Sequence, residues 1–171
     1  YIRTYNNSGR ETSYLGTGSD NSGQLRIYDK QGETRSYLGD GYLQAYNQFG
    51  ERTIFLGTGT NGGGYLRTYN FSGQESIYVG TGADSSGQIR IYDNTGETGS
   101  FLGSGYFRTY NRFGKMTTFI GNATDGGGYL RTNNKFETET AFLGTNNANE
   151  GLINLNDKFG QSFWIRLNKK N

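Results

Sequence analysis

The sequence contains no cysteine, no proline and no histidine among its 171 residues. Without cysteine there are no disulfides and no thiolate metal sites, and without histidine the commonest general base and transition-metal ligand are missing. Hydrophobic residues make up only 32% of the chain, so we expect thin β-layers and not one thick core. No apolar run approaches the ~20 residues that span a bilayer, and no signal peptide is recognisable, so we expect no membrane insertion.

The sequence also lacks a large excess of positive or negative charge. The formal net charge is only +2, and basic and acidic residues are interspersed, so the basic stripe needed for nucleic-acid binding is missing. Glu33 and Glu97 recur beside turns. We expect carboxylates that are repeated and exposed in this way to be solvated surface groups and not the catalytic pair of a glycoside hydrolase. The long glycine-rich loops offer one Asp or none, too few carboxylates for calcium. We therefore expect no enzyme activity, no catalytic residues, no metal site and no cofactor.

The sequence does have 29 glycines, 15% aromatic residues and a clear internal repeat. Residues 1–64 and 65–128 are identical at 39 of 64 positions without gaps, and a third copy starts at Tyr129. Repeats of this kind stack into arrays whose last member is a cap. We expect a repeat array over residues 1–151, with repeats at 1–23, 24–41, 42–64, 65–87, 88–105, 106–128 and 129–151, and a C-terminal capping repeat at 152–171. The apolar residues of the expected cap are Phe163, Trp164, Ile165 and Leu167.

Each repeat holds two short runs rich in Tyr, Thr, Ile and Leu, which are typical of β-strands. Between the runs an Asn or Asp lies three residues before a glycine, which favours a type I turn closed by a glycine bulge. The fold class is therefore all-β, with eight tandem hairpins. Glu137 replaces the glycine in the seventh repeat, so we expect that turn to be strained or differently closed. The Asx residues that lie three residues before a glycine are Asn6, Asp29, Asn47, Asn70, Asp93, Asn111 and Asp157.

Counting back from the turn places Thr4 opposite Thr12 and Ile2 opposite Tyr14. On this count one face carries Ile2, Thr4, Thr12 and Tyr14, and the other carries Tyr1, Arg3, Tyr5, Glu11, Ser13 and Leu15. We expect the first face to be the core, because it joins an aliphatic and an aromatic column, and we expect both faces to be partly covered. The aliphatic column is Ile2, Leu25, Leu43, Leu66, Ile89, Phe107, Leu130 and Ile153; the aromatic column is Tyr14, Tyr37, Phe55, Tyr78, Phe101, Phe119 and Phe142.

The opposite face supplies the candidate ligand-binding surface. Sugars pack on aromatic rings while polar neighbours bind their hydroxyls, and a repeated array raises avidity. The alternative interpretation is that these tyrosines cover the sheet or meet another chain. The candidate residues are Tyr5, Tyr28, Tyr46, Tyr69, Tyr92, Tyr110, Arg3, Arg26, Arg67, Arg90, Arg108 and Arg131.

The succession of strand, Asx-x-x-Gly turn, strand and Leu-Gly resembles the hairpin-repeat shafts of phage tail fibres and of trimeric bacterial surface fibres. The resemblance implies an elongated β-solenoid, or three chains intertwined in a β-helix or β-prism. The elements Tyr5-Asn6-Asn7-Ser8-Gly9 and Tyr28-Asp29-Lys30-Gln31-Gly32 are also similar to the YD repeats of bacterial shell proteins. Those repeats continue with Gly-Arg, whereas Glu or Gln usually follows the glycine here.

Three functions remain open from the sequence, of which a shell or scaffold protein of the YD type is the third. The first is a structural, non-catalytic fibre segment of a virion appendage or cell surface, homotrimeric, with cell-surface glycans or other fibre components as partners. The low apolar content of the chain favours this function, because a chain with few apolar residues can bury them more fully against other copies of itself than alone. The second is a monomeric repeat lectin, closed into a ring or open, that binds carbohydrate through the Tyr and Arg ladders. The sequence predicts no nucleic-acid partner.

Overall fold

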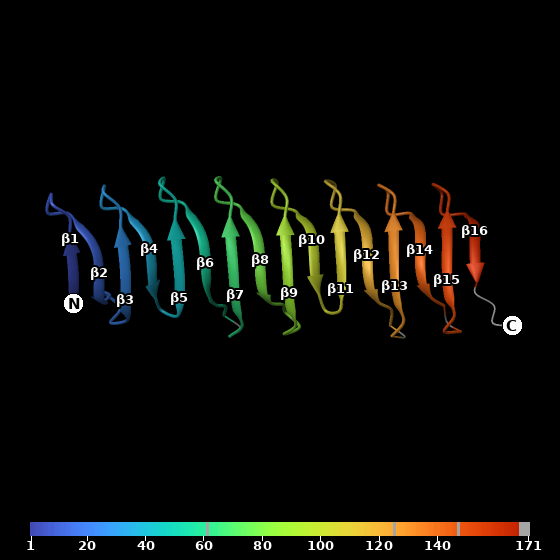
Figure 1. Ribbon diagram of the computed structural model, residues 1–171, viewed down its shortest axis with the longest axis horizontal. Helices are drawn as coiled ribbons and strands as arrows, with labels where there is room; N and C mark the ends of the chain where they lie inside the picture. The colour runs from blue at the N-terminus through green and yellow to red at the C-terminus, as the bar shows by residue number, and fades with distance from the viewer. Residues whose placement is uncertain (61, 125, 147, 168–171) are drawn as a thin grey trace. The chain divides into compact units, whose positions relative to one another are not determined.

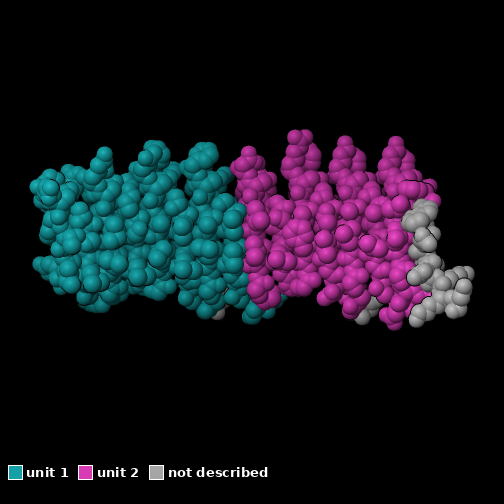
Figure 2. Space-filling view, viewed as in Figure 1, with its two compact units in different colours: residues 1–85 teal, residues 86–171 magenta. Residues whose placement is uncertain are grey.

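The computed structural model describes all residues except 61, 125, 147 and 168–171, and it describes no side chains for residues 164–167. The described chain is all-β, with antiparallel strands joined as hairpins, which confirms the expected fold class (Figure 1). It divides into two compact units, residues 1–85 (unit 1) and 86–171 (unit 2), shown in Figure 2. The described part holds no helix, and hence none long and apolar enough to cross a membrane.

Strands within each unit pair with their neighbours in chain order, always antiparallel (Figure 1). Unit 1 contains β1 (Ile2–Tyr5), β2 (Glu11–Thr17), β3 (Gly23–Tyr28), β4 (Thr34–Gly39), β5 (Tyr42–Tyr46), β6 (Arg52–Thr58), β7 (Gly64–Tyr69) and β8 (Glu75–Thr81). Unit 2 contains β9 (Gly87–Tyr92), β10 (Thr98–Gly103), β11 (Tyr106–Tyr110), β12 (Met116–Asn122), β13 (Gly128–Asn133), β14 (Glu139–Thr145), β15 (Gly151–Asn156) and β16 (Ser162–Leu167). Of the expected cap, Phe163 is exposed, and the other three side chains lie outside the described residues.

The Asx turns have the predicted geometry. In the first hairpin the amide of Asn6 donates to the carbonyl of Arg10 (2.9 Å), and the amide of Gly9, at φ +78°, donates to the carbonyl of Asn6 (2.9 Å). The Asn6 side-chain oxygen also accepts bonds from the amides of Ser8 and Arg10, both at 3.0 Å. The type I turn with a glycine in the left-handed region is therefore confirmed, because Asx and Gly each supply what the turn needs.

The seventh turn is strained and not differently closed. Glu137 lies at φ +67°, and its amide still donates to the carbonyl of Asn134 at 3.0 Å. A residue with a Cβ is disfavoured in this conformation. The Glu137 carboxylate accepts bonds from the amide of Met116 and the ammonium of Lys115, both at 3.1 Å. These two contacts lower the pKa of Glu137, the amide bond contributing most.

The opposite edge explains why repeats have two lengths. In the long form the ladder continues to the pair Thr17 and Gly23, and a turn closes between Gly18 and Ser22. In the short form the two-residue turn Asp40-Gly41 joins β4 to β5, with φ of +50° and +76°, as a type I′ turn requires. The short form therefore lacks the last strand pair of the long form and has a shorter turn. The register of the rest of the sheet is the same in both forms.

A β-bulge follows each Asx turn. In the first hairpin Tyr5 pairs with Glu11 and Thr4 with Ser13, which leaves Thr12 as the extra residue. The Thr4 hydroxyl lies 2.7 Å from the Thr12 hydroxyl and 2.6 Å from the Ser13 hydroxyl. Thr12 and Ser13 therefore both contact the side chain of Thr4. One extra residue moves every later side chain of the strand to the opposite face.

The bulge overturns the predicted register. The observed pairs are Ile2 with Leu15 and Arg3 with Tyr14, so the predicted pairs of Ile2 with Tyr14 and Thr4 with Thr12 are wrong. The predicted aliphatic and aromatic columns consequently lie on opposite faces, and the expected core that joined them does not exist. Among the described hydrophobic residues, only Phe119 is buried.

We call the two faces the aliphatic face and the aromatic face. The aliphatic face carries an unbroken row of paired residues in each unit: Ile2, Leu15, Leu25, Leu38, Leu43, Leu56, Leu66 and Val79, then Ile89, Leu102, Phe107, Ile120, Leu130, Leu143 and Ile153. The aromatic face carries the predicted aromatic column, the Arg and Tyr ladders, and Tyr1, Tyr42, Tyr65, Tyr106 and Tyr129. No second layer of the described chain covers either face.

Glycine makes room for the aromatic side chains. Tyr106 pairs with Gly121, and Tyr129 pairs with Gly121 and Gly144. A Cβ on Gly121 would lie 2.5 Å from the Tyr106 Cβ and 2.9 Å from the carbonyl oxygen of Gly105. The glycine that follows the aliphatic residue at the end of each second strand is therefore part of the strand and is needed for packing.

Candidate ligand-binding groove on the aromatic face

All twelve predicted ligand-binding residues belong to the aromatic face. The Tyr ladder lies at the Asx-turn end of the sheet, where Tyr5 pairs with Glu11 and Tyr110 with Met116. The Arg ladder lies two residues before the Tyr ladder in each strand, further from the Asx turns. It alternates across the sheet with aromatic residues, as in the row Arg90, Phe101, Arg108, Phe119, Arg131 and Phe142. The structure thus brings the two predicted ladders together and adds the aromatic column between the arginines. That these residues bind a ligand remains a prediction.

The rings of this face stack on one another. Phe119 stacks with Tyr106 at a centroid distance of 5.5 Å and with Tyr129 at 4.6 Å. The guanidinium carbon of Arg108 lies 4.2 Å from the centroid of Tyr106 and 5.4 Å from that of Phe119. Because neighbouring rings and guanidinium groups occupy the ring faces, stacking of a sugar on these rings is disfavoured.

The arginines differ in their charge partners. Arg3 lies 3.2 Å from the carboxylate of Glu11, and Arg67 lies 3.4 Å from that of Glu75. A side-chain hydrogen bond with Tyr5, together with the charge of Glu11, raises the pKa of Arg3. The pKa of Arg67 is also raised. Burial alone would lower it, but the charge of Glu75 acts in the opposite direction.

The three arginines that unit 2 contributes to the Arg ladder form no ion pair among the described residues: Arg90, Arg108 and Arg131. The reason lies in the first residue of the following strand. This position holds Glu11 and Glu75 in the paired cases, but Thr98 follows Arg90 and Met116 follows Arg108. Glu139 follows Arg131, but its carboxylate accepts a bond from Asn156 at 3.3 Å.

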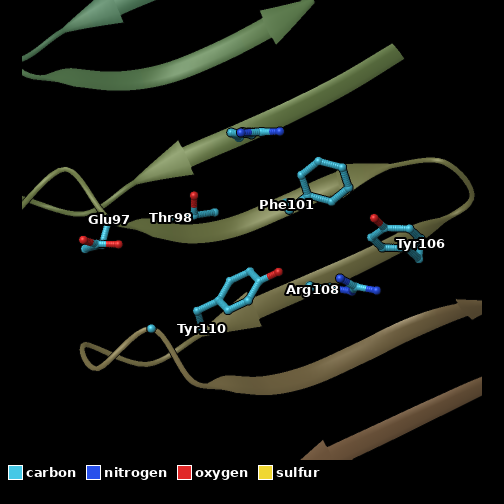
Figure 3. A pocket seen from close by; sticks show the side chains of 8 residues that line it. Glu97, Thr98, Phe101, Tyr106, Arg108 and Tyr110 are labelled. Atoms are coloured by element: carbon cyan, nitrogen blue, oxygen red, sulfur yellow. The ribbon is translucent and has the colours of Figure 1, made fainter. Parts of the chain in front are cut away.

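Arg90 and Arg108 share one groove, with Phe101 between them on β10. The cavity has a volume of about 360 Å³. Figure 3 shows Phe101, Tyr106 and Arg108 along one part of the groove, and Glu97 with Tyr110 nearer the Asx turns. The lining residues are Arg90, Glu97, Thr98, Phe101, Tyr106, Arg108, Tyr110 and Gly114. Two unpaired cations above aromatic rings favour an anionic group as ligand.

The internal repeat provides a comparison site 64 residues earlier. Arg26 corresponds to Arg90, but Gln44 stands where Arg108 does. The Gln44 side-chain oxygen accepts a bond from the hydroxyl of Tyr46, and Arg26 bonds to Gln24 at 3.1 and 3.3 Å. The earlier site therefore has one cation where the later site has two. Arg26 bonds to Gln24 as Arg90 bonds to Gln88, at 3.4 Å, in the later site.

Sequence reasoning missed two features. Phe101 belongs to the groove but was assigned to the opposite face, because the bulge was not foreseen. A second feature is a set of exposed phenylalanines at the Asx turns: Phe49, Phe71, Phe113, Phe136 and Phe159. Figure 2 shows side chains projecting from this turn edge of each unit. An Asx-x-x-Gly turn leaves its two middle side chains in solvent, and this signal was available in the sequence.

No family model matches the chain, and no curated protein has a matching sequence. Among the described residues, no group of three or more acidic side chains is placed to hold a metal ion.

Proposed function

We propose that this chain is a structural, non-catalytic segment of a fibre, in which several copies cover one another's aliphatic faces. The observation that carries the proposal is the uncovered row of aliphatic side chains. Leu15, Leu38 and Leu56 are 51%, 49% and 50% exposed in the middle of their strands. A continuous exposed apolar patch of this kind marks an interaction surface.

The row is large enough to support association. Eight strands at about 4.8 Å per step give the row of unit 1 a length of roughly 34 Å. Covering the exposed half of one leucine stabilises a complex by about 1 kcal/mol. A row of eight such residues is therefore comparable to the association cost of about 4–15 kcal/mol.

In the proposed assembly three copies turn their aliphatic faces inward and close a triangular prism. The stacked aromatic faces then form the outer wall, where the arginines remain accessible. This arrangement agrees with the resemblance to the shafts of phage tail fibres and trimeric surface fibres. We accordingly place the segment at a virion or cell surface, with further fibre components as partners.

The test is light scattering coupled to size exclusion. We expect a mass near three times the chain mass of 19.0 kDa, and a monomer after Leu15, Leu38 and Leu56 are all changed to Thr. The control changes Phe49 and Phe71 to Ser, which removes apolar surface that is 76% and 86% exposed at the turns and should leave the mass unchanged. A wild-type monomer at high concentration overturns the proposal, and a dimer overturns the trimer.

A second candidate function is carbohydrate binding, including the case of a monomeric lectin. The groove around Arg90 and Arg108 favours it, because two cations there have no carboxylate partner among the described residues. The stacked rings speak against recognition by ring stacking. Saturable binding of any glycan by the folded chain would test this function.

A further inference from the structure

Three guanidinium groups of unit 2 lie in one row on the aromatic face. Arg90, Arg108 and Arg131 come from β9, β11 and β13, and each pair of neighbours flanks one phenylalanine, Phe101 or Phe119. Strands two apart are separated by roughly 9.6 Å. The row therefore presents cations at a regular interval along the direction in which the strands follow one another.

The donors of these arginines are of two kinds. The Nε atoms of Arg90, Arg108 and Arg131 are buried and have no hydrogen-bond partner in the described part of the chain. An atom without access to solvent cannot bond a ligand from outside, so the terminal amino groups of each guanidinium are the donors left to a ligand. A carboxylate can accept two parallel bonds from a guanidinium, which makes arginine the preferred residue for such groups.

We propose that this row binds a linear acidic polysaccharide, with its carboxylates seated on Arg108 and its neighbours Arg90 and Arg131. The inference rests on the second candidate function, carbohydrate binding, and names its ligand class. Specificity comes from the charge of the polymer, since the rings offer little free face to a sugar. Unit 1 lacks a matching site, because Gln44 replaces the second cation.

A nucleic acid fits the row less well. Proteins that bind single strands add base stacking on open aromatic rings. Here the ring of Phe119 is already stacked between Tyr106 and Tyr129.

The experiment is calorimetric titration of the full chain with polygalacturonate and with its fully methyl-esterified form, which keeps the backbone but removes the charge. We expect saturable binding of the acid form only. Arg108→Gln should weaken it by about tenfold, as expected for the loss of a charged hydrogen bond. Arg112→Gln removes the same charge from a turn outside the groove and should change affinity less than twofold. Circular dichroism checks that both variants are folded.

The reverse substitution provides a gain of function. Gln44→Arg should create a second site in unit 1 and raise the binding capacity of the chain for the acid polymer. Equal binding of both polymer forms would overturn the acidic ligand but keep carbohydrate binding. Binding of neither form would overturn the inference, whereas carbohydrate binding itself is overturned only if no other glycan binds either. Tighter binding of single-stranded DNA than of polygalacturonate, or equal losses in Arg108→Gln and Arg112→Gln, would also overturn the inference.

Discussion

Phe119 and Ile120 are successive residues of β12, yet the first is 5% exposed and the second 45%. They point to opposite faces of the same sheet, and no second layer covers either face in the described chain. The comparison shows that the burial of a side chain in this sheet depends on the size of its neighbours on the same face. A single β-layer can bury one face without a partner if its side chains are long enough to cover one another.

The aromatic face covers itself because rings and guanidinium groups reach across strands. Phe119 contacts two neighbouring tyrosine rings, and Arg108 and Arg131 lie within 6.0 Å of its centroid. Arginine stems can cover apolar surface while their charge stays near water. The result is a thin core made within one face.

The aliphatic face cannot cover itself in this way. Cross-strand neighbours such as Ile120 and Leu130 have Cβ atoms about 5 Å apart, and their short side chains end close above the sheet. Each touches its neighbours at the sides and leaves its end in solvent. Stability of the chain is therefore expected to depend mainly on the aromatic face, whereas the proposed fibre would bury the aliphatic face.

The largest expected effect is the difference in stability between truncating a residue of the aromatic face and truncating its neighbour on the aliphatic face. Phe119→Ala should lower the free energy of unfolding by about 3 kcal/mol or more, as for a buried aromatic residue. Ile120→Ala should lower it by about 1 kcal/mol, because half of the side chain is already in solvent. Urea unfolding at a protein concentration where the chain is monomeric measures both.

Repeating the pair of measurements at high protein concentration sharpens the comparison. If copies cover the aliphatic face, the loss caused by Ile120→Ala should grow with concentration, since binding to the folded state adds stability. The loss caused by Phe119→Ala should stay larger at every concentration. Equal losses in the monomer would show that the two faces do not differ in burial.

A smaller effect is expected from adding a methyl group to the aromatic face. Gly121→Ala places a Cβ 2.5 Å from the Tyr106 Cβ and should cost about 1–3 kcal/mol of unfolding free energy. Gly128→Ala is the matched control, because no atom lies within 4 Å of the position that its Cβ would occupy and its φ is not left-handed. Thermal unfolding monitored by circular dichroism should separate the two variants, and similar midpoints would contradict the packing role of Gly121.

The local elements were predictable because each depends on neighbouring residues alone. An Asx side chain that bonds two amides and a glycine at positive φ define the turn wherever they occur. The faces were not predictable in the same way. The bulge at Thr12 has no residue signature in this sequence, and one uncounted residue reverses every later side chain.

The candidate site was predictable in part for the same reason. Arg90, Arg108 and Tyr110 precede the bulge in their hairpins, so counting placed them correctly on one face. Phe101 follows the bulge and was assigned to the other face. The absence of carboxylate partners could have been read from Thr98 and Met116, which replace the glutamates of other repeats, but only with the correct register.

The smallest expected effect tests how closed the aromatic face is around one hydroxyl. Burial, together with the nearby carboxylate of Asp40, raises the pKa of Tyr37 to about 12, and the Tyr37 hydroxyl lies 3.2 Å from that carboxylate. The folded state thus favours neutral tyrosine, so this contribution is complete below pH 10 and is lost as the pH rises from 10 towards 12.

Tyr37→Phe should therefore lose less stability than the wild type between pH 10 and 12, because the ionising group is gone. Phe101 occupies the corresponding position 64 residues later, so the face accommodates phenylalanine there. Urea midpoints at pH 8, 10, 11 and 12 measure the difference, and absorbance at high pH should show one fewer late-titrating tyrosine in the variant. Identical pH profiles for the two proteins would mean that the hydroxyl is open to water, and that the aromatic face is less closed at β4 than at Phe119.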